Sequence, residues 1–187
     1  MSRSNAETPL CLSRRRFLLA GGAGAMTVVL GDLFPGRVFA DDEDRKGKFA
    51  AYPKKRIARL ADLEVDRPLE FQYPDDGPHS ISFLIRLGTK AGGGVGPDQD
   101  IVAFNTLCPH QGGLLRRSYD ARWKVAGPCP LHLTTFDLTR HGMVVAGHAT
   151  EALPQVVLEE KDGVLYAVGI LGLIYGYPSN LAFVKEG

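Results

Sequence analysis

Two short stretches of the sequence each place one cysteine close to one histidine. They read Cys108-Pro109-His110 and Cys129-Pro130-Leu131-His132, with fewer than twenty residues between them. Thiolates and imidazoles are donors that both iron and zinc accept. One possibility is a [2Fe-2S] centre with the two cysteines on one iron and the two histidines on the other. The other is a tetrahedral structural zinc, and the ligand set alone leaves both open.

The residues around the four donors favour the iron-sulfur centre. Zinc ribbons usually repeat one ligand spacing, whereas here one residue lies inside the first pair and two lie inside the second. The chain then reads LTTFD over residues 133–137 and GHATEALP over residues 147–154. Both stretches resemble the Rieske family, in which the second ligand loop runs into a hydroxyl residue and an aromatic-Asp pair, and a third, proline-bearing loop covers the cluster. A zinc site or a vestigial site is the alternative.

The N-terminus carries the features of an export signal. Residues 13–18 read SRRRFL and precede an apolar run that ends before Pro35, and Ala40 is a small residue suited to cleavage. This pattern predicts a twin-arginine signal over residues 1–40 and hence a periplasmic protein. Four glycines and Asp32 interrupt the apolar run, so it would span a membrane poorly. Membrane association would follow only if the signal were retained.

The remaining chain is long enough for one compact domain. Residues 41–53 form a charged stretch that we interpret as a solvated linker, and residues 54–187 are predicted to form a single domain with a cluster-binding subdomain at about 105–155. With Cys11 inside the signal, Cys108 and Cys129 are the only thiols of the mature chain. The net charge of +1 and the lack of a basic stripe interleaved with aromatic residues argue against nucleic-acid binding.

Short apolar runs separated by Pro, Gly and Asp predict an all-β domain. Period-two spacing of Ile81, Phe83, Ile85 and Leu87 predicts a strand with one core face and one wet face. The turn residues 161–163 predict a hairpin, and the glycine-rich stretch 89–100 predicts a loop. The predicted strands are residues 55–59, 69–73, 80–87, 101–105, 122–126, 135–137, 156–160 and 164–170.

Together, residues 93–103, the two ligand loops, residues 147–155 and residues 173–176 resemble the small Rieske subunit of arsenite oxidase. Iodate reductase has a similar small subunit. The resemblance implies a Rieske-type antiparallel β-sandwich with one [2Fe-2S] cluster, and a large molybdopterin subunit bound in a heterodimer or larger complex. It also implies a soluble carrier, either a c-type cytochrome or a cupredoxin. A Rieske protein of a quinol-oxidising complex is a further alternative, although it predicts a retained anchor and a disulfide.

The same resemblance assigns roles near the cluster and implies an electron-transfer subunit without catalytic residues of its own. Cys108 and Cys129 would hold the buried iron, and His110 and His132 the outer iron. Relatives with a bridging disulfide carry cysteines where this chain has Gly113 and Leu131, so the bridge is absent. The other residues assigned to the cluster environment are Thr134 as a hydroxyl donor to a bridging sulfide, Phe136 in the place of a hydrogen-bonding Tyr, and His148 and Pro154 in the covering loop.

Overall fold

The described chain is built of strands. The computed structural model describes residues 51–182 and 184, so the predicted signal and most of the predicted linker lie outside it. Among these residues there is no α-helix, and none forms a helix that could cross a membrane. The all-β prediction is confirmed. The elements are β1 (Lys55–Arg59), the 3-10 turn η1 (Leu60–Asp62), β2 (Leu69–Gln72), β3 (Ile81–Arg86), β4 (Ile101–Asn105), β5 (Tyr119–Asp120), β6 (Val125–Ala126), β7 (Thr135–Asp137), β8 (Met143–Ala146), β9 (Gln155–Lys161) and β10 (Val164–Leu171).

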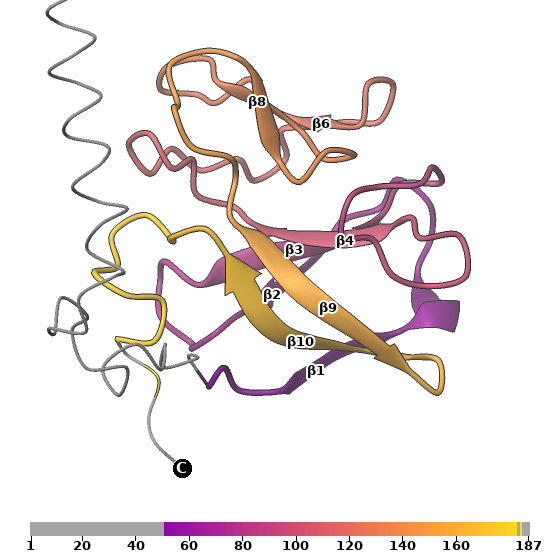
Figure 1. The fold of residues 1–187 in the computed structure, drawn as a ribbon. Coiled ribbons are helices and arrows are strands. Elements are labelled where there is room, and N and C mark those ends of the chain that lie inside the picture. The colour runs from indigo at the N-terminus through magenta and orange to yellow at the C-terminus, as the bar shows by residue number, and fades with distance from the viewer. Residues whose placement is uncertain (1–50, 183, 185–187) are drawn as a thin grey trace, which may run out of the picture. The chain divides into compact units, whose positions relative to one another are not determined.

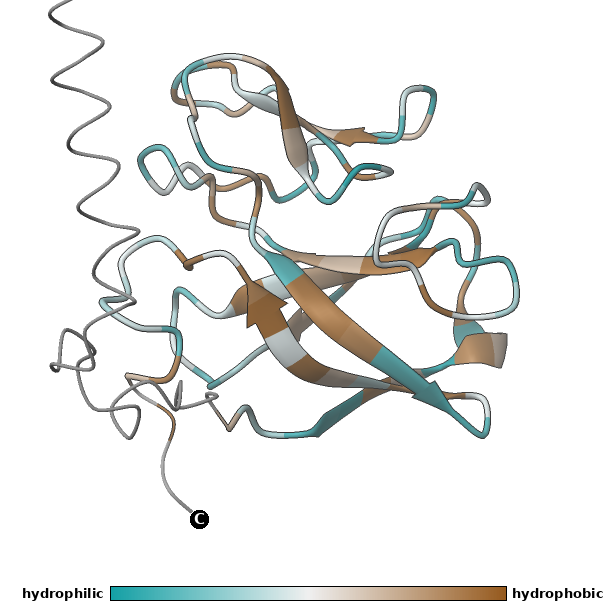
Figure 2. Ribbon diagram, in the orientation of Figure 1, coloured by the Kyte–Doolittle hydropathy of each residue, from teal (hydrophilic) through white to brown (hydrophobic). Residues whose placement is uncertain are grey.

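Six strands form the larger sheet, in the order β1-β10-β9-β4-β3-β2 with every neighbouring pair antiparallel (Figure 1). The hairpin between β9 and β10 is confirmed: Asp162 and Gly163 form its turn with φ of 52° and 72°. Two positive φ angles match the right-handed twist of the strands that they join. Figure 2 shows hydrophobic residues along the middle of β9 and hydrophilic residues at its hairpin end.

The smaller sheet has the order β5-β6-β7-β8, and it carries the second ligand loop between β6 and β7. Its strands β5 and β8 were not predicted, and the predicted strand at 122–126 is wrong over its first three residues. Those residues belong to a turn in which Lys124 has a φ of 54°. Strands of two to four residues are too short to show an alternating pattern.

The wet face predicted for β3 is wrong, because the strand is buried on both sides. Phe83 and Ile85 join the hydrophobic cluster that contains Cys108 and Cys129, the two predicted ligand cysteines. Leu84, which lies between them, is fully buried in the other cluster, formed with β9 and β10. Successive side chains of a strand point to opposite faces. Since residues of the smaller sheet pack on one face of β3 and residues of β9 and β10 pack on the other, both faces are buried.

The glycine-rich stretch 89–100 is a loop, as predicted, and it makes hydrogen bonds to segments of both sheets. At its base Arg86 donates to Asp98 and to the buried Asp100, at 2.9 Å each. At its tip the backbone N–H of Gly92 donates to the carbonyl of Thr139, and the Gly92 carbonyl accepts from the Gln155 side chain. A Cβ at Gly92 would lie 2.5 Å from the His141 ring. The glycine therefore allows close contact with the smaller sheet.

A half-buried carboxylate forms a second link between the sheets. Asp66 precedes β2 and accepts hydrogen bonds from Lys124 Nζ, at 2.6 and 2.8 Å, and from the Tyr119 hydroxyl. Burial raises the pKa of Asp66, but the hydrogen bonds from Lys124 and Tyr119 and the charge of Lys124 outweigh it, so the pKa is lowered overall. A carboxylate with a lowered pKa stabilises the fold at neutral pH, and this contribution is lost as the pH falls through that pKa.

We expect Asp66→Asn to destabilise the protein by about 1–2 kcal/mol at pH 7, because it removes a partly buried ion pair. The difference from the parent should shrink as the medium is acidified below pH 4, where the unfolded carboxylate also protonates. Thermal unfolding at several pH values measures both effects. Asp76→Asn is the control, since its ion pair with Lys55 is exposed and should contribute little. Equal losses for the two variants, or a difference that persists in acid, would contradict the expectation.

Candidate metal centre

The two ligand loops share one backbone pattern. In the first, the Cys108 N–H donates to the Gly113 carbonyl and the Gly112 N–H donates to the Cys108 carbonyl, both at 2.8 Å. In the second, the Cys129 N–H donates to the Thr134 carbonyl at 2.8 Å, and the Leu133 N–H donates to the Cys129 carbonyl at 2.9 Å. The fourth residue after each cysteine has a positive φ, 69° at Gly112 and 59° at Leu133. The unequal Cys-to-His spacing thus conceals two matched turns.

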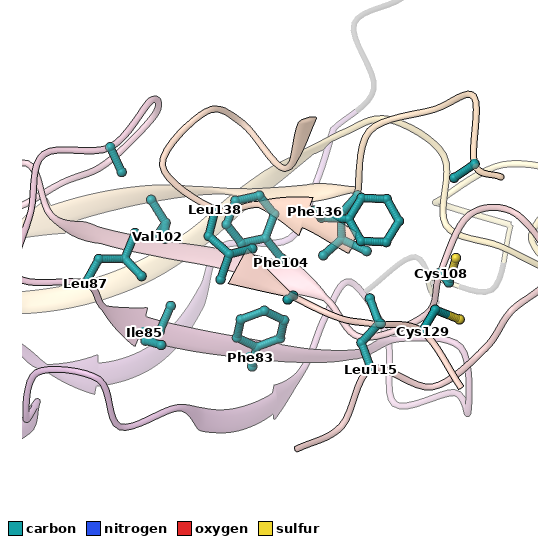
Figure 3. Close-up of a cluster of buried hydrophobic side chains, with 14 residues drawn as sticks. Phe83, Ile85, Leu87, Val102, Phe104, Cys108, Leu115, Cys129, Phe136 and Leu138 are labelled. Carbon is teal, nitrogen blue, oxygen red and sulfur yellow. The ribbon is translucent and has the colours of Figure 1, made fainter. Parts of the chain in front are cut away.

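These turns bring the four predicted ligands together. Cys108 and Cys129 are almost completely buried and are not joined to each other. They lie together at one end of a hydrophobic cluster, beside Leu115 (Figure 3). The rings of His110 and His132 have centroids 4.7 Å apart, and the Nδ1 atom of each is buried without a hydrogen-bond partner among the described residues. Buried polar atoms without partners are rare.

The donors fit a metal centre electrostatically. Burial raises the pKa of the Cys108 thiol, and the neighbouring Cys129 raises it further. Two thiolates would therefore repel each other in this apolar environment unless a cation compensated them. Within the described residues no three His, Cys, Asp or Glu side chains converge on a single metal position. The donors are arranged as one sulfur pair and one imidazole pair, and a [2Fe-2S] centre with two ligands on each iron needs such pairs.

The covering loop packs directly on the second ligand loop. Thr134 is fully buried, and its Oγ1 accepts the backbone N–H groups of His148 and Ala149 at 3.1 and 3.3 Å. A hydroxyl that accepts two hydrogen bonds retains its own proton for donation, as the predicted role of Thr134 requires. A Cβ at Gly147 would lie 2.3 Å from Thr134 Cα. Pro154, buried at the end of this loop, accepts the N–H of Asn105 through its carbonyl.

The histidines divide into two groups. The exposed ring of His148 lies 6.0 Å from the ring of His110 and 6.1 Å from that of His132, so three imidazoles gather at the centre. His79 instead contacts the ring of Tyr177, and His141 pairs with Gln155 at 2.8 Å. The sequence indicated the two ligand histidines by their spacing from cysteine. His148 was expected near the cluster through the covering loop, and the structure places its ring beside both predicted ligand rings, but no spacing in the sequence indicated that contact.

The positions of the missing disulfide lie side by side. A Cβ at Gly113 would lie 3.2 Å from Leu131 Cγ, although the two residues come from different ligand loops. The same Cβ would lie 2.5 Å from Cys129 Sγ, which leaves no free space for a side chain at position 113. Leu131 is 54% exposed, so this position carries a partly solvent-exposed apolar side chain directly before His132. With no bridge, backbone hydrogen bonds shape each loop by itself, and close packing of Gly113 against Cys129 and Leu131 joins the two.

Phe136 belongs to the buried cluster that contains both cysteines, and it cannot donate a hydrogen bond. We expect Phe136→Tyr to raise the midpoint potential of the loaded protein by about 40–65 mV, since one added hydrogen bond to Cys129 sulfur is worth roughly 1–1.5 kcal/mol. Protein-film voltammetry measures the shift. Phe71→Tyr in the opposite core is the control and should leave the potential unchanged. An unchanged or lower potential, with the new hydroxyl within bonding distance of Cys129, would contradict the expectation.

Comparisons with known proteins agree with this geometry. The sequence model of the Rieske [2Fe-2S] domain family matches residues 84–157 of this chain, which include all four predicted ligands. The chain is 55% identical to iodate reductase subunit IdrB of Denitromonas iodatirespirans over 172 residues, covering 92% of this chain and 88% of that protein. It is 50% identical to iodate reductase subunit IdrB of Pseudomonas sp. (strain SCT) over 169 residues, covering 90% and 84%.

The architecture also has a counterpart among solved structures. The soluble domain of Rieske protein II (soxF) from Sulfolobus acidocaldarius superposes with a TM-score of 0.59 at 22% sequence identity. The match covers 68% of this chain and 83% of that one. At this level of identity the likeness shows the fold alone.

Proposed function

The chain belongs to the Rieske [2Fe-2S] family, and from that premise we propose that it relays single electrons as the small subunit of a molybdenum oxidoreductase of the iodate reductase type. One observation carries the proposal, namely the 55% identity to an iodate reductase subunit over nearly the whole of both chains. The expected arsenite oxidase is the second candidate, since the sequence resembles its small subunit as well.

The ligand assignment is part of this proposal. When bound, a Rieske cluster accepts and releases one electron. Cys108 and Cys129 would hold the buried iron within the hydrophobic cluster, and His110 and His132 would hold the outer iron through their buried Nδ1 atoms. Two neutral imidazoles leave less negative charge on the centre than two more thiolates would, which favours its reduced form. The Thr134 hydroxyl would add a hydrogen bond to the sulfur of the centre.

The substrate can be tested in the complex. We would co-express the chain with the molybdopterin protein encoded beside it, purify the complex, and record the resonance of the reduced centre. If the complex is an iodate reductase, adding iodate to the reduced complex removes the signal, and arsenite does not generate it in the oxidised complex. If it is an arsenite oxidase, arsenite generates the signal. A neighbouring region that encodes no molybdopterin protein would remove the subunit proposal.

The electron carrier and the location belong to the same proposal. The twin-arginine pattern at residues 13–18 supports folding in the cytoplasm and export to the periplasm, where a c-type cytochrome or a cupredoxin would exchange electrons with the complex. Replacing Arg14 and Arg15 together with lysine preserves the charge but removes the guanidinium pair. Fractionation should then find the loaded protein in the cytoplasm. Normal periplasmic accumulation would indicate another export route.

A further inference from the structure

The ring of His148 lies against the two predicted ligand rings in two different ways. It is nearly parallel to His110, with an interplanar angle of 22°, and edge-on to His132, with an angle of 77°. We propose that His148 is a positioning residue of the centre, which holds no iron and fixes the orientation of the His110 ring by stacking on it. This inference rests on the proposed assignment of His110 and His132 as ligands.

The backbone of His148 is held in place independently of its side chain. Its N–H donates to the buried Thr134 hydroxyl at 3.1 Å, and the next N–H donates to the same oxygen. Gly147, with a φ of 102°, lets the chain pass within contact distance of Thr134. Since these contacts fix the Cα of His148 beside the second ligand loop, its exposed ring has only a short side chain with which to move.

Apart from the edge-on contact between the two ligand rings themselves, with centroids 4.7 Å apart, His148 makes the only ring contact to them among the described residues. A histidine that binds a metal usually donates its second ring N–H to a carboxylate, a carbonyl or water. Among the described residues, neither His110 nor His132 makes a side-chain hydrogen bond, and their Nδ1 atoms are buried and free. A ring held through Nδ1 and through its own Cβ can still tilt about the line that joins these two points. Stacked and edge-to-face ring pairs are favourable contacts, so a parallel ring on one face restrains that rotation.

The restraint should act on one ligand more than on the other. The His148 ring lies nearly parallel to His110, with centroids 6.0 Å apart, but meets His132 at an angle close to perpendicular. A parallel neighbour opposes tilting of the ring out of its plane, whereas an edge-on pair makes contact only through the edge of one of its rings. Removing the His148 ring should therefore change the electronic coupling of one ligand nitrogen and leave the other almost unchanged.

The test uses the full chain loaded with its cluster and measures the nitrogen hyperfine couplings of the reduced centre. In His148→Ala one of the two ligand couplings should shift or broaden, and chelator-induced loss of visible absorbance should be about two- to tenfold faster, the factor expected for one aromatic pair. His148→Phe should keep both the coupling and the rate of loss at their parental values, because it retains a planar ring at this position although that ring has no polar atom. His148→Gln should restore neither. His79→Ala is the matched control, since that ring lies against Tyr177.

The outcomes separate this inference from the proposed function. A parent without a Rieske-type resonance would contradict the ligand assignment itself. A normal parental resonance with unchanged couplings in His148→Ala would overturn the stacking role alone. Parental values in His148→Gln but not in His148→Phe would overturn it as well.

In a Thr134→Val background, which removes the hydroxyl that holds the His148 backbone, replacing His148 should have a smaller effect. Full additivity of the two changes would overturn the link to Thr134.

Discussion

Replacing His132 with alanine is expected to abolish the Rieske-type electron paramagnetic resonance signal of the reduced protein. The Nδ1 atom of His132 is buried, and no described residue donates to it or accepts from it. The remaining cysteines and His110 do not converge on one point, and no other His, Cys, Asp or Glu side chain of the described part completes a group around them. The outer iron would therefore lose one of its two protein ligands. The nearest other imidazole, His148, has its ring centroid 6.1 Å from that of His132 and would have to leave that position to take its place.

The matched controls are His141→Ala and His79→Ala, because both remove an imidazole away from the three-ring group. Their resonances should keep the parental shape and intensity. Iron content and the visible spectrum, measured on the same samples, distinguish a lost cluster from an altered one. A His132→Ala protein that retained the native spectrum would show that the ligand assignment is wrong.

Replacing Gly147 with alanine should weaken retention of the cluster more than any other change to the covering loop. The new methyl group would lie 2.3 Å from Thr134 Cα and 2.7 Å from the Thr134 nitrogen, which are backbone atoms that no rotamer change can move. A φ of 102° adds strain for a residue with a side chain. Overpacking and backbone strain together should cost about 2–6 kcal/mol, enough to lower the temperature of cluster loss by about 10 °C or more.

Gly163→Ala separates strain from contact. That glycine also has a positive φ, of 72°, but a Cβ there would meet nothing within 4 Å. Its cost should be about 1–2 kcal/mol, from the backbone alone. Following the visible absorbance of the loaded protein during heating compares the two variants directly. Equal shifts would mean that the contact between Gly147 and Thr134 contributes nothing to the covering loop.

Features set by a few neighbouring residues could be predicted from the sequence. The strands Lys55–Arg59, Ile101–Asn105 and Thr135–Asp137 begin and end where their residue types predicted, and the Asp162-Gly163 turn forms as expected. The ligand pairs were indicated in the same way, since each cysteine lies within three residues of its histidine. Local chain geometry decides such features, because the groups concerned are close in sequence before the protein folds.

Features that depend on distant residues required the tertiary structure. Strand β3 has no wet face because two sheets cover it, and no pattern within the strand records that. Leu133 has a left-handed backbone conformation in a turn with the same hydrogen bonds as the turn at Gly112. Leucine rarely adopts that conformation, so its residue type did not predict it. His148 lies beside His110, with its backbone held by the Thr134 hydroxyl of a loop some fourteen residues earlier. The sequence by itself thus determined which donors the chain offers, and packing between segments far apart in the chain decided how they are oriented.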